Sequence, residues 1–257
     1  MTTPLFTGVG VALVTLFDDD GEVDLDATAT LAAELVGAGV TAVVLAGSTG
    51  EAAALEAPER VAMVAAVREA IPAGVPIVVG TGAPSARQAA RLTADVAAGG
   101  ADGVLVLSPP GSADPSTYYR EVVRAADGAL PVMAYHFPLM SAPGIDVELL
   151  PRLTDLGVVG LKDSSGDASR LVRTVESFGG WLYVGSPWLL SAAGPLGATG
   201  AILAVANVEP VLSAAAFGGD TAAQRALAAS NLRAAGPSGV KAVLAERTGR
   251  SARTRVG

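Results

Sequence analysis

Residues 156–167 read LGVVGLKDSSGD, and the interpretation of the whole chain starts from this stretch. An apolar run ends at Lys162, and the following residues, 163–167, have the composition of a turn and a helix start. A strand that carries an amine at its C-terminal end leaves that amine partly buried. A partly buried lysine gives up its proton more readily than an exposed one, and the neutral amine is a nucleophile. Arginine stays protonated and forms no imine.

Lysine is scarce in this chain, which has 15 arginines but only Lys162 and Lys241. Lys241 stands in the arginine-rich end of the sequence, and we interpret it as a solvated surface charge. The basic excess from Thr221 onward is interpreted in the same way, as a solvated helix face and a frayed end rather than a binding arm. The lysine at position 162 therefore indicates that an amine is needed there, not merely a positive charge.

Short β-rich runs alternate with alanine-rich helical stretches along the chain. Eight such units without a break in composition predict a parallel (β/α)8 TIM barrel over residues 1–218, followed by a short C-terminal helical tail over 219–257. A doubly wound parallel sheet is the alternative. The stretch Gly236–Gly239 is expected to break the tail into two pieces. Strands are predicted near 9–17, 40–46, 75–80, 103–108, 131–135, 157–162, 181–185 and 199–204. Helices are predicted near 26–38, 58–71, 84–98, 114–127, 146–154, 167–178 and 187–194, with another from about 208.

Composition limits the class of protein. Of the 257 residues, 51% are hydrophobic but only 4% aromatic, so the core is expected to be aliphatic and closely packed. No run reaches the roughly 18 apolar residues of a membrane helix. Because the first basic residue is Arg60, we expect no secretory signal and a cytoplasmic protein. The absence of cysteine excludes disulfides and thiolate chemistry, and the net charge of -8 argues against a nucleic-acid partner.

In a parallel barrel, reactive residues gather at the C-terminal ends of the strands. After the second predicted strand the sequence reads Gly47-Ser48-Thr49-Gly50-Glu51. Two glycines allow a tight turn whose N–H groups converge and hold a carboxylate, and the two hydroxyl groups add donors. An ordinary turn between a strand and a helix, with a capping hydroxyl, would have a similar sequence.

The fifth predicted strand ends in Tyr135-His136. Tyr135 and Lys162 are one β/α unit apart, so they are expected on neighbouring strands at the same height, where a phenol would shuttle the protons that imine formation requires. A tyrosine taken alone is more often a half-buried structural residue. His136 is the only histidine, which rules out multi-histidine metal sites. Strand alternation points it away from Tyr135, toward a packed or supporting position.

Small residues stand at the ends of the seventh and eighth predicted strands, at Gly185-Ser186 and Gly197–Ile202. A barrel phosphate site is one interpretation. Because no lysine or arginine stands nearby, we favour the other, in which small side chains leave room over the barrel mouth.

Three motifs together, residues 47–51, Tyr135–Pro138 and Gly160–Asp163, resemble the dihydrodipicolinate synthase/N-acetylneuraminate lyase family. These are class I pyruvate aldolases and related lyases, which form a Schiff base, and the match runs in register across about 1–217. The resemblance implies a homo-oligomer, either a dimer or a tetramer, and no metal or organic cofactor.

The same resemblance implies a role for individual residues. Lys162 would form the imine with a 2-keto acid, and Tyr135 would relay protons. The backbone amides of Ser48 and Thr49 would bind the substrate carboxylate, and the Ser48 hydroxyl would join the relay. Ile202 would face the site through its carbonyl group.

Three departures from the family pattern bear on the substrate. Gly111 stands where the synthases carry a relay tyrosine, and Tyr118 and Tyr119 fit the helix that follows. Met140 replaces an arginine that grips the carboxylate of the aldehyde substrate. The C-terminal region is shorter than the family's, which bears on the usual tetramer. A mouth with Phe137 and Leu139 suits an uncharged or apolar aldehyde.

We therefore predict a Schiff-base lyase or aldolase acting on pyruvate or a 2-keto(-3-deoxy) acid, with an aldehyde as its second small-molecule partner. Dihydrodipicolinate synthase activity is one alternative. A non-catalytic protein that binds a keto acid is another, from a different class.

Overall fold

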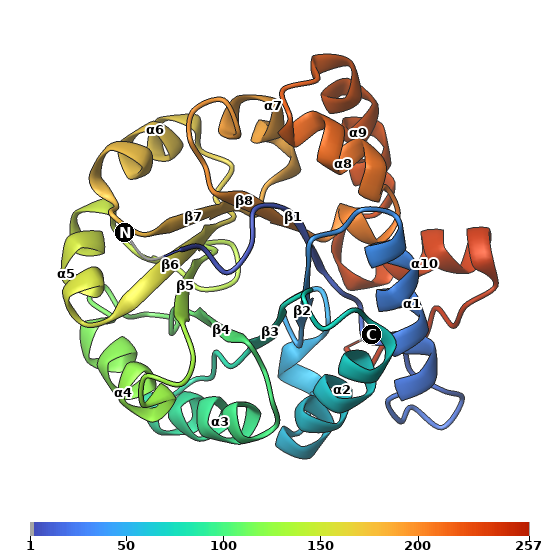
Figure 1. The fold of residues 1–257 in the computed structure, drawn as a ribbon, viewed down its shortest axis with the longest axis horizontal. Helices are drawn as coiled ribbons and strands as arrows, with labels where there is room; N and C mark the ends of the chain where they lie inside the picture. The colour runs from blue at the N-terminus through green and yellow to red at the C-terminus, as the bar shows by residue number, and fades with distance from the viewer. Residues whose placement is uncertain (1–2, 257) are drawn as a thin grey trace.

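The structure is a computed structural model that describes residues 3–256 (Figure 1). Eight parallel strands close into a barrel in the order β1 to β8, and helices surround it. The barrel closes where β8 pairs with β1, with Gly8 opposite Gly200 and Val11 opposite Leu203. The predicted TIM barrel is confirmed, and this closure excludes the doubly wound sheet.

The strands are short and lie close to the predicted ranges. They are β1 Gly8–Ala12, β2 Ala42–Leu45, β3 Ile77–Gly80, β4 Gly103–Leu107, β5 Val132–His136, β6 Val158–Asp163, β7 Trp181–Val184 and β8 Gly200–Leu203. The first strand was predicted to reach residue 17 but ends at Ala12. Beyond it, the N–H groups of Val14 and Leu16 bond to the side chains of Asn207 and Thr28 instead of to a neighbouring strand.

The helices follow the strands in the expected alternation. They are α1 Leu25–Gly37, α2 Ala57–Ala70, α3 Ala86–Ala98, α4 Ser116–Ala126, α5 Leu150–Asp155, α6 Ala168–Ser177, α7 Leu190–Ala193, α8 Pro210–Phe217, α9 Thr221–Arg233 and α10 Gly236–Thr248. Single 3₁₀ turns lie at Ala52–Ala54, Val147–Leu149, Pro187–Leu189 and Val205–Asn207. Within residues 3–256, no helix combines the length and apolar character needed to cross a bilayer.

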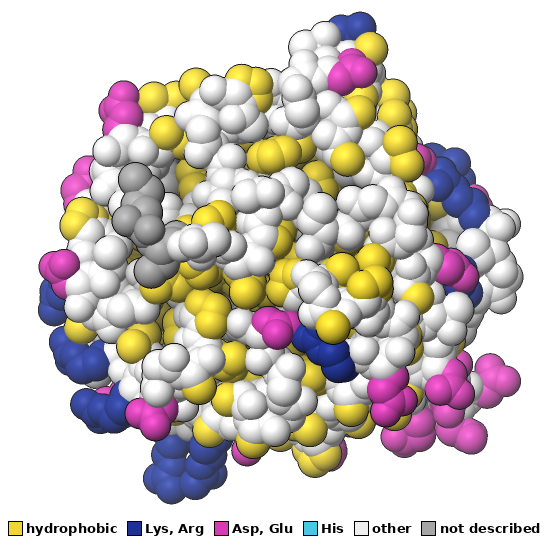
Figure 2. All heavy atoms as spheres, in the orientation of Figure 1, with side chains coloured by type: hydrophobic (Ala, Val, Ile, Leu, Met, Phe, Trp, Pro, Cys, Tyr) yellow, Lys and Arg dark blue, Asp and Glu magenta, His cyan; other side chains and the backbone are white. Residues whose placement is uncertain are grey.

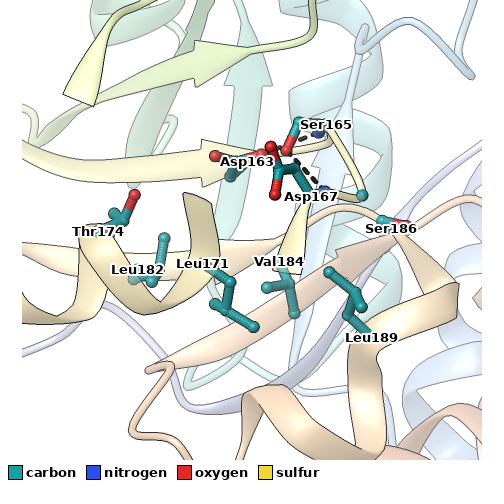
Figure 3. A pocket seen from close by; sticks show the side chains of 10 residues that line it. Asp163, Ser165, Asp167, Leu171, Thr174, Leu182, Val184, Ser186 and Leu189 are labelled. Carbon is teal, nitrogen blue, oxygen red and sulfur yellow. Dashed lines mark hydrogen bonds between the residues drawn. The ribbon is translucent and has the colours of Figure 1, made fainter. Parts of the chain in front are cut away.

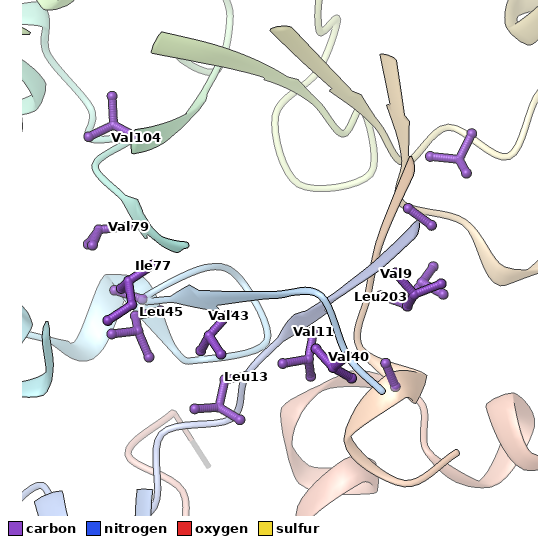
Figure 4. Close-up of a cluster of buried hydrophobic side chains, with 14 of the residues drawn as sticks. Val9, Val11, Leu13, Val40, Val43, Leu45, Ile77, Val79, Val104 and Leu203 are labelled. Carbon is purple, nitrogen blue, oxygen red and sulfur yellow. The ribbon is translucent and has the colours of Figure 1, made fainter. Parts of the chain in front are cut away.

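Strand alternation divides the buried side chains into two separate layers. The outer layer packs between the barrel and its helices and includes Val9, Val11, Val43, Ile77 and Val104, as Figure 4 shows. The inner layer fills the barrel with Phe6, Val44, Leu105, Met133, Trp181, Tyr183 and others. Full burial of such a side chain stabilises the fold by about 1.5–3 kcal/mol. The outer layer is almost entirely aliphatic, as the composition predicted.

The C-terminal tail consists of α9 and α10. The break between them falls at Ala234 and Ala235, so Gly236–Gly239 forms the first turn of α10 and not the break itself. Pro237 is tolerated there because the first turn of a helix leaves its N–H groups unbonded anyway. The domain boundary near residue 218 stays a prediction.

The interpretation of Lys241 as a solvated surface charge is wrong. Its side chain is 0% exposed and forms an ion pair with the buried Glu51, 2.5 Å away. Burial lowers the pKa of Lys241, against the opposing effect of its hydrogen bond to Glu51. The prediction of a frayed basic end is wrong as well, because Arg250 pairs with Glu34 and Arg255 with Glu59. The end of the chain folds back onto α1 and the β2–α2 connection, which sequence periodicity alone does not reveal.

Charged side chains are unevenly placed on the face that Figure 2 presents. Acidic side chains gather over the loop before α1, where Asp18, Asp19, Asp20 and Glu22 follow one another, and basic ones lie over α3 and α4. The middle of this face is mostly uncharged. The net charge of -8 is therefore not spread evenly over the surface.

Asn207 joins the two strands at which the barrel closes. Its Oδ1 accepts the N–H of Val14 at 3.1 Å, and its Nδ2 donates to the carbonyls of Ala12 and Ala204, each at 2.8 Å. The Asn207 side chain is buried, so without it these backbone groups would lose their hydrogen-bond partner and could not turn to bulk water instead.

We expect Asn207→Ala to lower the free energy of unfolding by about 2–4 kcal/mol, because it leaves buried backbone groups unsatisfied. Urea denaturation measures the change as a lower midpoint. The matched control is Asn231→Ala on the outer helix α9, for which a change within about 0.5 kcal/mol is expected. Equal effects of the two substitutions would contradict this role.

Candidate active site

A cavity of about 980 Å³ opens where the strands end. Each strand from β2 to β8 sends at least one residue to its wall: Gly47, Gly80, Leu107, Tyr135, Lys162, Gly185 and Ala204 lie at or just after those strand ends. This is the end of the barrel at which catalytic residues collect. The sequence-predicted residues Gly47, Ser48, Thr49, Tyr135 and Lys162 all line this one cavity.

Lys162 and Tyr135 are direct neighbours across β6 and β5. The Nζ atom of Lys162 lies 4.3 Å from the centroid of the Tyr135 ring, and both side chains are buried. Among residues 3–256, no carboxylate comes within 4.0 Å of this Nζ. The amine is therefore enclosed and near a phenol, and no ion-pair partner for it lies in the described part of the chain.

The neighbouring acid, Asp163, points to the other face of β6. Its Oδ2 pairs with Arg170 at 2.6 Å and its Oδ1 accepts the N–H of Ser165 at 2.8 Å. Figure 3 shows Asp163, Ser165 and Asp167 beside a separate cavity of about 10 Å³, bordered by Leu171 and Leu189. That space is the size of a single water molecule. The arrangement separates the Asp163 charge from Lys162 by the thickness of the strand.

The space around the amine accommodates only small side chains at Gly185 and Ser164. A Cβ atom at Gly185 would fall 1.9 Å from the Ser164 Oγ and 2.7 Å from the Lys162 Cε. Ser164 in turn donates a long hydrogen bond, 3.4 Å, to the Tyr135 hydroxyl. The favoured interpretation of Gly185 as a residue that leaves room over the barrel mouth agrees with this packing.

The turn at Gly47–Glu51 is held from behind by Arg60. This buried guanidinium donates to the carbonyl of Gly80 at 2.7 Å and to that of Ala52 at 2.6 Å. Burial lowers the pKa of Arg60 to about 10, so it is charged at neutral pH. Ala46 and Glu51, at the two ends of the turn, have φ of 50° and 56°, which non-glycine residues seldom adopt.

Ile202 lies apart from the other predicted residues. It is fully buried in the inner layer of the barrel, and the residue of that strand end in the cavity wall is Ala204. Its role in substrate binding stays a prediction.

His136 faces outward, as alternation predicted. Its Nδ1 accepts the N–H of Ile145 at 2.8 Å, and Gly144 packs against the ring. Burial, with a smaller effect of Arg170, lowers the pKa of His136 to about 4, so the ring is neutral at pH 7 and free to accept this bond. It is a packed residue behind the site. In the described part of the chain, no group of three or more His, Asp or Glu side chains is arranged to hold a metal.

The loops after β4 and β5 form the rim of the cavity. Gly111 has φ of 77° and donates its N–H to the carbonyl of Ala142 at 2.7 Å, and the Ser141 hydroxyl donates to the carbonyl of Ser108. An L side chain at position 111 would strain this loop. Met140 is 54% exposed, so it stands at the rim rather than in the depth of the cavity.

Three residues that support the site were not predicted from the sequence. Ser164 falls in the predicted turn over 163–167, Arg60 falls in the helix predicted near 58–71, and Lys241 was interpreted as a surface charge. Scarcity of lysine, the signal that singled out Lys162, applied equally to Lys241. For Arg60 and Ser164 no comparable signal is present.

Comparison with known proteins agrees with this geometry. The sequence pattern of the dihydrodipicolinate synthetase family matches residues 5–235. The chain is 33% identical to the 4-hydroxy-tetrahydrodipicolinate synthase of Pseudomonas aeruginosa over 234 residues, 87% of this chain and 80% of that protein. It is 31% identical to YagE of Escherichia coli, named as a candidate 2-dehydro-3-deoxy-D-gluconate aldolase, over 81% of this chain and 72% of YagE.

The fold is similar to solved structures as well. The crystal structure of YagE in complex with pyruvate superposes with a TM-score of 0.87 at 26% identity, covering 98% of this chain and 92% of that one.

We expect Gly185→Ala to displace the Lys162 side chain and to slow its reaction with a keto acid about 100-fold, since misplacing a reacting group by about 1 Å costs that much. Borohydride trapping of the imine at fixed times measures the rate. Gly179→Ala, at a glycine with open space around its Cβ position, serves as control and should react like wild type. An unaltered rate in Gly185→Ala would show that the amine tolerates displacement.

Proposed function

The chain belongs to the dihydrodipicolinate synthetase family, and on this premise we propose that Lys162 forms the imine with pyruvate or a related 2-keto acid. The protein is a pyruvate-dependent class I lyase or aldolase; enzymes of this family work through a lysine Schiff base and use no cofactor. The observation that carries the proposal is the buried amine of Lys162 beside Tyr135 in this cavity, with no carboxylate of residues 3–256 within 4.0 Å of the amine.

The proposed reaction begins when the neutral amine attacks the keto carbon. The resulting carbinolamine loses water, and the carbonyl oxygen leaves with that water as the C=N bond forms. The cationic imine then accepts the electron pair released when a bond at the adjacent carbon breaks, either to a proton or to an aldehyde fragment. The enamine formed in this way gives its electron pair to a proton or to the carbonyl carbon of an aldehyde, which restores the imine. Hydrolysis of the imine by water then releases the product and returns the amine.

We assign proton transfer in these steps to Tyr135. Its hydroxyl is close enough to Ser164 for a 3.4 Å hydrogen bond, and Ser48 lines the same cavity. Ser164 thus offers a hydroxyl partner where the family's tyrosine is missing at Gly111. The keto-acid carboxylate would bind the backbone N–H groups of Ser48 and Thr49, in the turn that begins at Gly47.

For the second substrate we propose an uncharged aldehyde. Among the described residues, Lys162 is the only lysine in the cavity wall and no arginine lines it, so a second carboxylate would meet no free cation. Apolar side chains form the rim, with Leu139 88% and Trp188 49% exposed. Burying such surface favours an apolar or neutral partner.

A second candidate substrate is a 2-keto-3-deoxy acid with several hydroxyl groups. Ser108, Ser141, Ser164, Ser165 and Ser186 all line the cavity, and their hydroxyls would bond to those of such a substrate. The relative YagE is named for an aldolase of this class. Synthesis of 4-hydroxy-tetrahydrodipicolinate is less well supported, because Gly111 and Met140 lack the tyrosine and arginine described above.

The predictions of a homo-oligomer and of a cytoplasmic location remain proposals. Val211 on α8 and Leu232 on α9 expose 66% and 71% of their surface, which supports an oligomer contact there. Light scattering on the purified chain tests the oligomer.

Borohydride reduction in the presence of pyruvate should add one pyruvate-derived group at Lys162, located by peptide mass spectrometry. Lys162→Ala and Lys162→Arg should form no adduct and lose at least about 1000-fold in turnover, because neither supplies a nucleophilic amine. The remaining lysine, Lys241, is an internal control, since its amine is already bonded to Glu51. An adduct that persists in Lys162→Ala would refute the assignment.

Met140→Arg should improve use of an aldehyde that carries a carboxylate, such as aspartate semialdehyde, lowering its KM about tenfold through a charge-assisted pair. Steady-state kinetics across neutral and charged aldehydes measure it, with the KM for pyruvate expected to stay constant. Leu139→Arg, one residue away and more exposed, is the matched control and should have less effect. If wild type already prefers the charged aldehyde, the proposal of a neutral partner fails.

A further inference from the structure

The buried ion pair between Lys241 and Glu51 joins segments that are far apart in the sequence. Both side chains are 0% exposed, and 190 residues separate them. The Lys241 Nζ also donates to the carbonyl of Arg253 at 2.7 Å and lies 4.2 Å from the centroid of the Phe17 ring. The amine of α10 is thus bonded to the end of the chain and to the last residue of the Gly47–Glu51 turn.

The other carboxylate oxygen of Glu51 is bonded by the C-terminal segment, residues 251–256. The backbone N–H groups of Arg255 and Val256 donate to Oε2 at 2.7 and 3.1 Å. Every hydrogen bond to this carboxylate within residues 3–256 therefore comes from position 241 or later. Figure 1 shows the last described residues beside β2 and α2.

The C-terminal segment is itself fixed to the barrel. The Arg255 guanidinium bonds to both carboxylate oxygens of Glu59, at 2.7 and 3.0 Å, and to the carbonyls of Gly21 and Ala54. It also lies 4.6 Å from the Phe17 ring centroid. The segment therefore does not extend into solvent, and its N–H donors hold the Glu51 carboxylate at a defined position.

The same elements reach the cavity. Val256, Gly236 and Pro237 line it together with Glu51, Ser48 and Lys162. Glu51 holds a left-handed backbone conformation, φ 56°, which a non-glycine residue keeps only when its surroundings enforce it. The hydrogen bonds that Lys241, Arg255 and Val256 donate to its carboxylate hold Glu51 in this conformation.

A buried ion pair is a weak source of net stability, because two charges must leave water to form it, yet it can specify one local conformation. We propose that Lys241 and the C-terminal segment are positioning elements of the keto-acid site: through Glu51 they hold the 47–51 turn in the conformation that presents its N–H groups to the substrate carboxylate. This inference rests on the proposed function of that turn.

The test compares pyruvate binding with turnover in full-length variants. Lys241→Met should raise the pyruvate concentration that gives half-maximal borohydride trapping about tenfold, since the carboxylate site is displaced while Lys162 is untouched. The maximal rate at saturating pyruvate should change by less than about threefold. The matched control is Arg233→Met, which removes an exposed ion pair to Glu246 in the same tail and should leave both values unchanged.

Two further variants keep the test decisive if Lys241→Met does not fold. Glu51→Gln/Lys241→Met removes both buried charges but leaves an amide oxygen for the N–H groups of Arg255 and Val256, so pyruvate affinity should return to within about threefold of wild type. Val256→Pro removes a single N–H donor from an exposed residue and should weaken pyruvate binding with little change in melting temperature.

The outcomes separate this inference from the proposed function. Failure of the wild type to trap pyruvate would refute the role of Lys162 itself. If the wild type traps pyruvate and the folded variants keep its half-saturating concentration, the segment is only a structural anchor and the inference is wrong. Equal losses in affinity and maximal rate, in step with melting temperature, would overturn it in the same way.

Discussion

The register between β5 and β6 is the constraint on which the site depends. Because Tyr135 pairs with Lys162, alternation sends both side chains into the barrel and sends His136 and Asp163 to the outer layer. A shift by one residue would exchange these faces and leave a carboxylate inside the barrel and the amine outside. The pairing of the amine with the phenol and the placement of the Asp163 carboxylate away from the amine follow from the same geometric rule.

Around this pair, glycine residues without side chains leave the space that other groups occupy. Gly185 leaves the volume that Lys162 and Ser164 occupy, and Gly80 allows the carbonyl of Ala46 to approach closely. The large side chains are at the rim, where Leu139 and Trp188 are exposed. Small residues near the amine and apolar ones at the mouth suit the proposed imine and its neutral partner, since excluding water limits premature hydrolysis of such an intermediate.

The turn at residues 47–51, proposed to bind the substrate carboxylate, depends on residues outside its own motif. Residues 47–51 allow a tight turn, but its conformation is supported by Arg60 from α2 and by Lys241 from α10. Both are buried cations that bond to oxygen atoms of the turn or its neighbours. Arg60 supports the turn through backbone carbonyls and Lys241 through the Glu51 carboxylate, so the conformation of the turn depends on two helices that are far apart in the sequence.

The barrel, the order of its units and the place of Lys162 at a strand end could be predicted from the sequence alone, because strand periodicity and the end of an apolar run are local properties. The sequence also indicated that Tyr135 and Lys162 lie on adjacent strands, since consecutive β/α units place their strands side by side. The partners of Lys241, Arg60 and Ser164 were decided only by the tertiary structure. A contact between residues 190 positions apart produces no periodic pattern in the sequence. A lysine also looks the same in the sequence whether it is solvated or paired with a buried carboxylate such as Glu51.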